Sequence, residues 1–166
     1  MSKLINQQRL LTDQWVRIDD TVAFPALVPV LISLTRWQRE RSILGARISP
    51  VGVQLATDDE ASAVAEDIGR FGLIAVHFPK FTDGRGYSIA RTLRDRFAYR
   101  GELRATGDVL RDQLFNLVRV GFDTFDLRTD QDVDASLAAF RDFSEAYQVS
   151  VERPIPLFRR RLLSVT

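Results

Sequence analysis

The sequence contains no cysteine and a single histidine, His77, and these shortages exclude several kinds of chemistry. Without cysteine, the chain cannot supply thiolate ligands for zinc or an iron–sulfur cluster, a disulfide framework or a cysteine nucleophile. A histidine-based metal site would have to take its other ligands from carboxylates or substrate atoms, so we expect no metal. Any redox role would therefore depend on a borrowed cofactor.

Long hydrophobic runs and an excess of one charge are also missing. No stretch approaches the roughly 20 apolar residues that cross a bilayer. Residues 1–11 hold only scattered apolar residues, unlike a secretory signal. The 23 Lys and Arg residues nearly balance the 22 Asp and Glu residues, so no basic field draws the chain to nucleic acid. These features predict a cytoplasmic protein that binds neither membranes nor nucleic acids.

The 166 residues, 45% of them hydrophobic, suffice for one domain with an ordinary core. Strand-like runs alternate with helical patterns along the middle of the chain. The predicted strands are 30–34, 51–56, 73–78, 102–106 and 124–127, and the helices that follow them are 35–44, 57–68, 87–97, 108–118 and 131–147. Residues 1–29 are predicted as a leader or strap with a short strand. Residues 148–166 are predicted as an extended tail with a basic cluster at Arg159–Arg161.

The alternation of about five strand–helix units predicts an α/β fold with a mainly parallel sheet and right-handed crossovers. Several strands carry polar residues among the apolar ones: Gln54, His77, Glu102, Arg104 and Asp126. A sheet covered by helices on both faces would have nearly continuous apolar strands, so this pattern favours a partial (βα)-barrel with the polar residues on its concave face. Its edges would need covering by the amino-terminal segment or a second subunit. A doubly wound open sheet is the alternative.

The loop after the predicted strand 73–78 is the first candidate site. Ligands of parallel sheets bind outside the carboxyl ends of the strands, and a glycine-rich turn that opens a helix presents free N–H groups to an anion. The candidate residues of this loop are Lys80, Asp83, Gly84, Arg85, Gly86 and Ser88. The glycines permit positive φ or close backbone approach, and the loop matches neither a Walker A motif nor a complete dinucleotide fingerprint. The structural alternative is a glycine turn capped by Asp83 and Ser88, with Arg85 in a salt bridge to a neighbouring loop.

A second loop of the same kind is predicted to share that edge of the sheet. Its candidate residues are Arg104, Asp108, Arg111 and Gln113, although Asp108 also fits the N-cap of the following helix. His77 is the candidate catalytic residue because an imidazole carries protons near pH 7, the alternative being a packed strand residue. The two loops together would bind a small anion or a partner.

The sequence resembles a bacterial family of unknown function. The matching segments are Phe78–Ser88, Arg100–Arg104, Gly107–Leu114 and Gly121–Asp123, and the resemblance extends over about residues 30–147. This family is typically encoded beside assimilatory sulfite reductase and is often labelled a probable oxidoreductase of sulfite reduction. The resemblance therefore implies a pathway, but it carries over no catalytic residues.

Three hypotheses follow for the function. The preferred one is an accessory protein of sulfate assimilation that contacts sulfite reductase, another sulfur-assimilation protein or a small anion through residues 80–88 and 104–113. A flavin- or nicotinamide-dependent oxidoreductase is the enzyme alternative, and only this alternative predicts a cofactor. The third hypothesis is a non-catalytic dimeric scaffold, a homo-oligomer of this chain.

Overall fold

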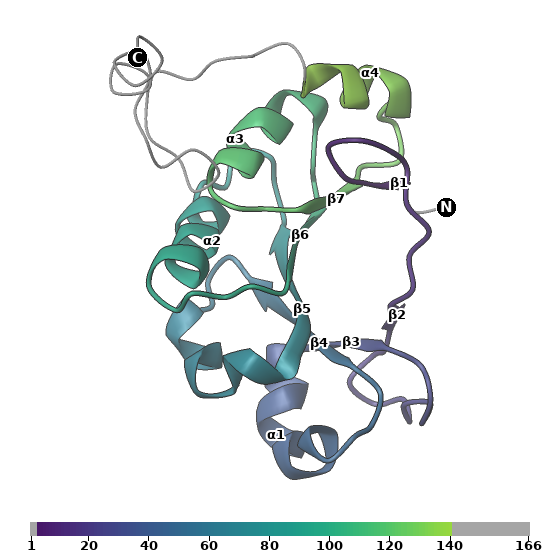
Figure 1. Cartoon of the computed structure of the whole chain (residues 1–166), viewed down its shortest axis with the longest axis vertical. Helices are drawn as coiled ribbons and strands as arrows, with labels where there is room; N and C mark the ends of the chain where they lie inside the picture. The colour runs from purple at the N-terminus through teal and green to yellow at the C-terminus, as the bar shows by residue number, and fades with distance from the viewer. Residues whose placement is uncertain (1–2, 141–166) are drawn as a thin grey trace, which may run out of the picture.

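The computed structural model describes residues 3–140, which form one seven-stranded sheet with helices packed against it (Figure 1). The strands are β1 (Lys3–Ile5), β2 (Val16–Arg17), β3 (Val30–Ser33), β4 (Val51–Ala56), β5 (Phe71–Phe78), β6 (Glu102–Gly107) and β7 (Thr124–Leu127). The α-helices are α1 (Leu34–Gly45), α2 (Arg85–Asp95), α3 (Leu114–Arg119) and α4 (Val133–Ala139). Two 3₁₀ helices complete the fold, η1 (Ala61–Arg70) and η2 (Arg111–Gln113).

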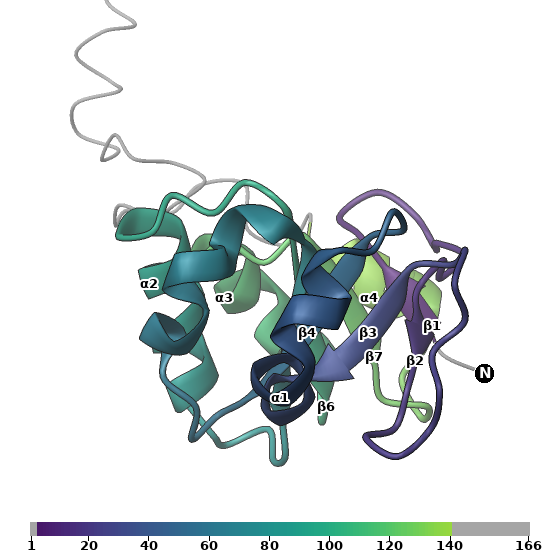
Figure 2. The same ribbon diagram turned by 90° about the horizontal axis from the view of Figure 1, so that it is seen from below.

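The strand order is β1-β7-β6-β5-β4-β3-β2, so β2 to β7 follow one another across the sheet as they do along the chain. These neighbours pair in parallel, and only β1 runs antiparallel to its partner β7. Right-handed crossovers in such an order place the connecting helices on the same face. Figures 1 and 2 show α1, α2 and α3 on the convex side of a strongly curled half-barrel. The predicted α/β partial barrel is confirmed, and the doubly wound alternative is wrong because the strand order does not reverse.

The two faces of the sheet carry different side chains, because successive residues of a strand point to opposite sides. The convex face and its helices share the main hydrophobic core, whose fully buried members include Trp37, Ile74, Phe78, Leu93, Leu103 and Phe125. On the concave face, Leu31, Leu73 and Ala75 pack with Trp15. The strand register then sets Gln54 beside Ala75 and Ala75 beside Arg104 on that face. The polar residues therefore gather where the sequence predicted them.

The amino-terminal segment covers both edges of the half-barrel. Lys3 pairs with Leu127 through the β1–β7 ladder, and Val16 pairs with Val30 through the β2–β3 ladder. Between these strands the chain crosses the open side, opposite the helices (Figures 1 and 2). This confirms the first of the two predicted ways to cover the edges. A second subunit is not needed for that purpose, and the predicted homo-oligomer stays a prediction.

Several helix boundaries differ from those predicted. Helix α1 was predicted to begin at residue 35, but Ser33 caps it, because the Ser33 side chain accepts a hydrogen bond from the Arg36 N–H over 3.0 Å. The segment after β4 forms a 3₁₀ helix, and α4 accounts for the described part of the predicted helix 131–147. The tail 148–166 lies outside the described residues. Among residues 3–140, no helix combines the length and apolar character needed to cross a membrane.

Candidate functional site

The loops that follow β5 and β6 meet at the carboxyl-terminal edge of the sheet. The Phe81 N–H donates to Asp108 Oδ2 over 2.8 Å, and Gln113 Nε2 donates to the Phe81 carbonyl oxygen over 2.9 Å. The neighbouring loop therefore holds both backbone polar groups of Phe81, while the residue remains 52% exposed. We call this joined surface, residues 79–88 and 107–113, the carboxyl rim.

Gly107 sets the direction of the second rim loop. Its φ of +91° is a conformation that glycine adopts readily and other residues rarely do. The resulting turn lets the Asp108 N–H donate to the Phe78 carbonyl oxygen over 2.8 Å. The Asp108 carboxylate then faces the first loop, so its predicted role as a helix N-cap is wrong. The residue at the N-cap position of η2 is Leu110, and its backbone N–H donates to Gln113 Oε1 over 2.9 Å.

Arg85 is already paired within the rim. Its Nε and Nη2 donate to the Asp83 carboxylate over 3.0 and 2.7 Å, and Thr57 Oγ1 donates to the same carboxylate over 2.6 Å. The hydrogen bonds from Arg85 and then Thr57 hold the pKa of Asp83 well below its usual range, and Asp83 in turn raises the pKa of Arg85. The ion pair is neutral overall, which favours a fixed turn over an anion cradle. The predicted salt bridge from Arg85 to a neighbouring loop is wrong, because its partner Asp83 lies in the same loop.

The remaining residues of the first rim loop are exposed or packed. Lys80, Gly84 and Ser88 are exposed. Of the two roles predicted for the glycines, close approach is confirmed at Gly86, because a Cβ there would lie 2.5 Å from the Phe78 ring. Gly84 has an ordinary φ of −77°. Packing of α2 on β5 therefore explains the glycine at position 86. Neither Gly84 nor Gly86 has a positive φ.

Arg104 lies on the concave face, and its predicted place on the rim is wrong. Alternate residues of β6 face the concavity, and Arg104 is one of them. Its Nη2 donates to Glu102 Oε1 and its Nη1 to Asp13 Oδ2, each over 2.8 Å. Thr124 Oγ1 donates to the same Glu102 oxygen over 2.6 Å. Arg104 therefore ties the amino-terminal segment to the sheet.

His77 also faces the concavity, at the end of β5. Burial and, to a smaller extent, the positive charge of Arg17 lower its pKa. His77 Nδ1 lies 3.5 Å from Thr106 Oγ1. A lowered pKa favours the neutral imidazole at pH 7, which could accept a proton. Its catalytic role stays a prediction.

The loop after β7 adds residues that the sequence reasoning missed. Arg128 Nη1 donates to Asp108 Oδ1 over 2.8 Å, and Arg128 Nε and Nη2 donate to the Asp130 carboxylate over 2.7 Å each. The Arg111 N–H donates to Gln131 Oε1 over 3.0 Å. The signal was present in the sequence, because these residues follow directly after a strand that was predicted correctly.

The ion pair between Arg128 and Asp130 leads to a prediction about pH. Hydrogen bonds from Arg128 lower the pKa of Asp130 from 3.8 to about 2. A depressed folded-state pKa stabilises the fold above the unfolded value of 3.8, and this contribution is lost as the pH falls toward about 2. A carboxyl NMR titration should therefore give Asp130 a midpoint near 2, and Arg128→Gln should raise it. An unchanged midpoint in that variant would exclude Arg128 as the cause.

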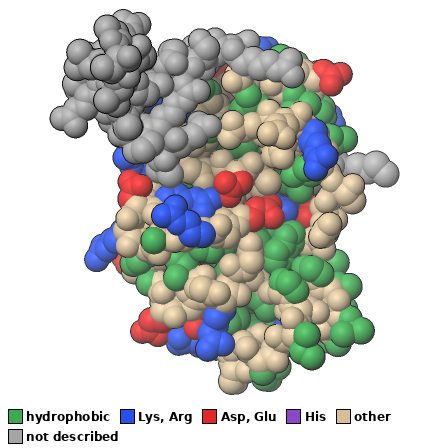
Figure 3. All heavy atoms as spheres, in the orientation of Figure 1, with side chains coloured by type: hydrophobic (Ala, Val, Ile, Leu, Met, Phe, Trp, Pro, Cys, Tyr) green, Lys and Arg blue, Asp and Glu red, His purple; other side chains and the backbone are tan. Residues whose placement is uncertain are grey.

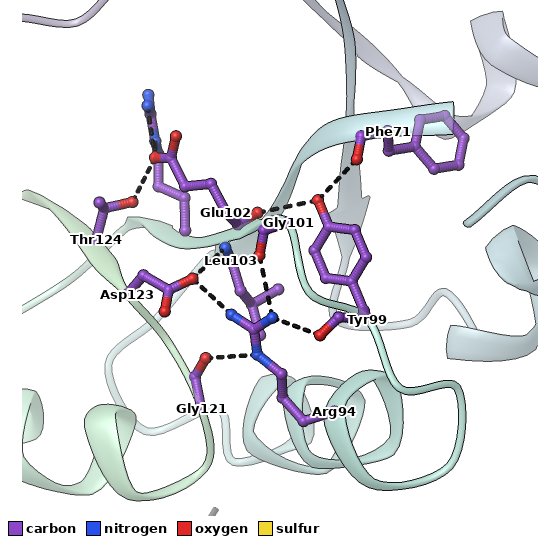
Figure 4. Close-up of polar contacts among 10 residues, drawn as sticks. Phe71, Arg94, Tyr99, Gly101, Glu102, Leu103, Gly121, Asp123 and Thr124 are labelled. Carbon is purple, nitrogen blue, oxygen red and sulfur yellow. Dashed lines mark hydrogen bonds and ion pairs between the residues drawn. The ribbon is translucent and has the colours of Figure 1, made fainter. Parts of the chain in front are cut away.

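A second polar cluster lies at the opposite, amino-terminal edge of the sheet. Figure 4 shows Arg94 of α2 reaching toward the loops that precede β6 and β7. Arg94 donates to the carbonyl oxygens of Tyr99, Gly101 and Gly121 over 2.6, 3.0 and 2.9 Å, and to Asp123 Oδ2 over 2.5 Å.

On the face drawn in Figure 3, acidic and basic side chains lie together over the middle of the molecule.

This amino-edge cluster is structural. Asp123 Oδ2 also accepts a hydrogen bond from the Leu103 N–H over 2.8 Å, and the Tyr99 hydroxyl lies 3.1 Å from the Phe71 carbonyl oxygen. Burial raises the pKa of Tyr99 and keeps its hydroxyl protonated. A Cβ on Gly101 would lie 2.3 Å from that hydroxyl oxygen. Close packing and hydrogen bonds to backbone groups therefore account for these residues without a ligand.

Comparison with known families gives a match over residues 52–158, well over half of the chain. The matching family is described as a bacterial protein of unknown function (DUF934). Comparison with curated proteins found no match. Comparison with solved structures found none either.

Proposed function

Because the chain belongs to this bacterial family of unknown function, we propose that it is a cytoplasmic accessory protein of sulfate assimilation that docks on sulfite reductase through the carboxyl rim. The resemblance in the sequence supports the pathway, since that family is typically encoded beside the reductase. The contacts of the rim support a docking role. Arg104 takes no part in this surface, because its side chain lies on the concave face.

The exposure of the Phe81 side chain on a fixed backbone is the observation that carries the proposal. The residue is 52% exposed, yet Asp108 and Gln113 hold its backbone N–H and carbonyl oxygen. An aromatic side chain on a held backbone loses little conformational freedom when a partner buries it. Aromatic residues in such positions often dominate the binding energy of interfaces. Phe81 is therefore the expected anchor of the complex.

The charges of the rim suit a protein surface better than a small anion. Arg85 is paired with Asp83, and Arg128 is shared between Asp108 and Asp130. A small anion would have to compete with these carboxylates for each guanidinium group. A protein partner can instead bury the aromatic ring and leave the existing ion pairs at the border of the interface.

Replacing Phe81 by alanine is expected to weaken the complex about 30-fold or more, the effect of losing a central aromatic anchor. The stability of the isolated protein should change little, because the side chain is already exposed. The measurement is a binding titration with purified sulfite reductase from the same organism, together with thermal unfolding of each variant. Equal affinity of the wild type and the variant would contradict the role of Phe81.

The matched control is Ile48→Ala. Ile48 is 97% exposed and lies in the loop between α1 and β4, at the opposite edge of the sheet. Its loss should leave the affinity unchanged. A yellow purified protein, or consumption of reduced nicotinamide with sulfite by this chain alone, would favour the oxidoreductase alternative and overturn the accessory role.

A further inference from the structure

A small polar cavity is lined by residues of β2, β3 and β4 and of the turn that follows β2. Its volume is about 180 Å³, enough for roughly six water molecules. The side chains that matter for its chemistry are those of Arg17, Asp19, Asp20, Ser33 and Gln54. It is separate from the carboxyl rim and from the amino-edge cluster.

The acidic wall of the cavity is fixed in place before any ligand arrives. Arg36 Nη1 donates to the Asp19 carbonyl oxygen over 2.5 Å, and Arg39 Nη2 donates to the Asp20 carbonyl oxygen over 2.8 Å. Ser33 Oγ donates to Asp20 Oδ1 over 2.6 Å. Side chains of α1 thus hold the backbone carbonyl groups of Asp19 and Asp20. The Asp19 carboxylate remains available to the cavity.

Two of the cavity's polar groups lack a partner. Gln54 Oε1 is buried and accepts no hydrogen bond from the described residues, and an unpaired buried acceptor is unfavourable. A modest rotation of the terminal amide, whose torsion is broad, would turn this oxygen toward a donor in the cavity. Among residues 3–140, no hydrogen bond or ion pair engages the Arg17 guanidinium, although its positive charge acts on His77 across the concave face.

These groups define one class of ligand. Arg17 would bind a carboxylate, whereas the Asp19 carboxylate and the Gln54 amide oxygen would accept hydrogen bonds from an ammonium group. Arg17 and Asp19 both line the cavity, so the two opposite charges can face one ligand. The described residues include no group of three or more His, Asp or Glu side chains arranged to hold a metal ion. An organic zwitterion fits the donors and acceptors better than a cation.

We propose that this cavity binds a small α-amino acid, with its carboxylate on Arg17 and its ammonium group on Asp19 and Gln54. The cavity volume restricts the ligand to amino acids with short side chains. This site does not depend on the docking role of the carboxyl rim, and either proposal can fail alone.

The test is an NMR titration of the full chain with glycine, L-alanine, acetate and methylammonium. Glycine or L-alanine should bind saturably with a Kd of about 1 mM or below, and should shift the side-chain amide signal of Gln54. Acetate and methylammonium each satisfy one half of the site and should bind about tenfold more weakly or worse. Equal binding of acetate and glycine would overturn the assignment, as would the absence of saturation at about 50 mM.

Variants of the charged residues complete the test. Arg17→Gln and Asp19→Asn should each weaken glycine binding about tenfold or more, while both proteins remain folded because the two residues are exposed. Arg9→Gln removes another exposed arginine of the amino-terminal segment, away from the cavity, and should leave binding unchanged. Retention of full affinity by Arg17→Gln would overturn the proposal.

Discussion

Arg94→Met is expected to lower the free energy of unfolding by about 3–5 kcal/mol. Arg94 is 9% exposed, and its guanidinium reaches three backbone carbonyl oxygens and the Asp123 carboxylate. Methionine keeps much of the apolar stem but supplies no donor. The three carbonyl oxygens would then lose the donors of the buried guanidinium, and each unpaired buried group carries a desolvation cost. The Asp123 side chain is 52% exposed, so water can replace its lost partner.

The large effect follows from what the guanidinium joins. Its hydrogen bonds connect the end of α2 with the loops that precede β6 and β7, so one side chain fixes the entry of two neighbouring strands. Asp123 extends the connection, because it also accepts from the Leu103 N–H in β6. Arg94→Lys would preserve the charge without the planar fork of donors, and we expect it to recover only part of the lost stability.

Chemical denaturation of the purified variants measures this prediction. The control is Arg91→Met, one turn earlier on α2, where the arginine is exposed and pairs with Asp95 over 2.8 Å. Such a surface pair contributes about 0.3–0.5 kcal/mol, so the control should unfold almost like the wild type. Similar losses in the two variants would show that the buried hydrogen bonds of Arg94 contribute no more than a surface ion pair.

The sheet was predictable because strand patterns depend on local residue types. The runs 51–56 and 124–127 coincide with β4 and β7, and the polar residues among the apolar ones revealed which face lacks helices. The concave position of Gln54 and His77 follows from this alternation alone. Fold class and the half-barrel were therefore accessible from the sequence, which left open whether the amino-terminal segment or a second subunit covers the edges.

The candidate site was predictable in position but not in detail. The sequence located the loops after β5 and β6, yet the partner of each charged side chain depends on which segments fold against each other. Asp108 illustrates this, because its hydrogen bonds to Phe81 and Arg128 span 27 and 20 residues. The Arg104 contact with Asp13 spans 91 residues and crosses the concave face. Local propensity favoured an N-cap role for Asp108, and tertiary contacts determined its actual one.

Gly107→Ala is expected to destabilise the fold by about 3 kcal/mol and to weaken the proposed docking surface as well. The φ of +91° is unfavourable for any residue with a Cβ, and that atom would lie 2.3 Å from the Phe78 carbonyl oxygen. Strands β5 and β6 would have to move apart at Phe78 and Gly107, which are paired in the register. The hydrogen bond from the Asp108 N–H to the Phe78 carbonyl oxygen would lengthen with them.

Gly84→Ala separates this effect from the general cost of losing a glycine in the carboxyl rim. Gly84 has an ordinary φ, and a Cβ there would meet nothing within 4 Å, so the stability should change by no more than about 0.5 kcal/mol. Denaturation and binding to sulfite reductase should be measured on both variants. Because Asp108 holds the Phe81 N–H, a displaced Asp108 should release the proposed anchor. A folded Gly107→Ala protein with unchanged affinity would mean that docking does not require the held backbone of Phe81.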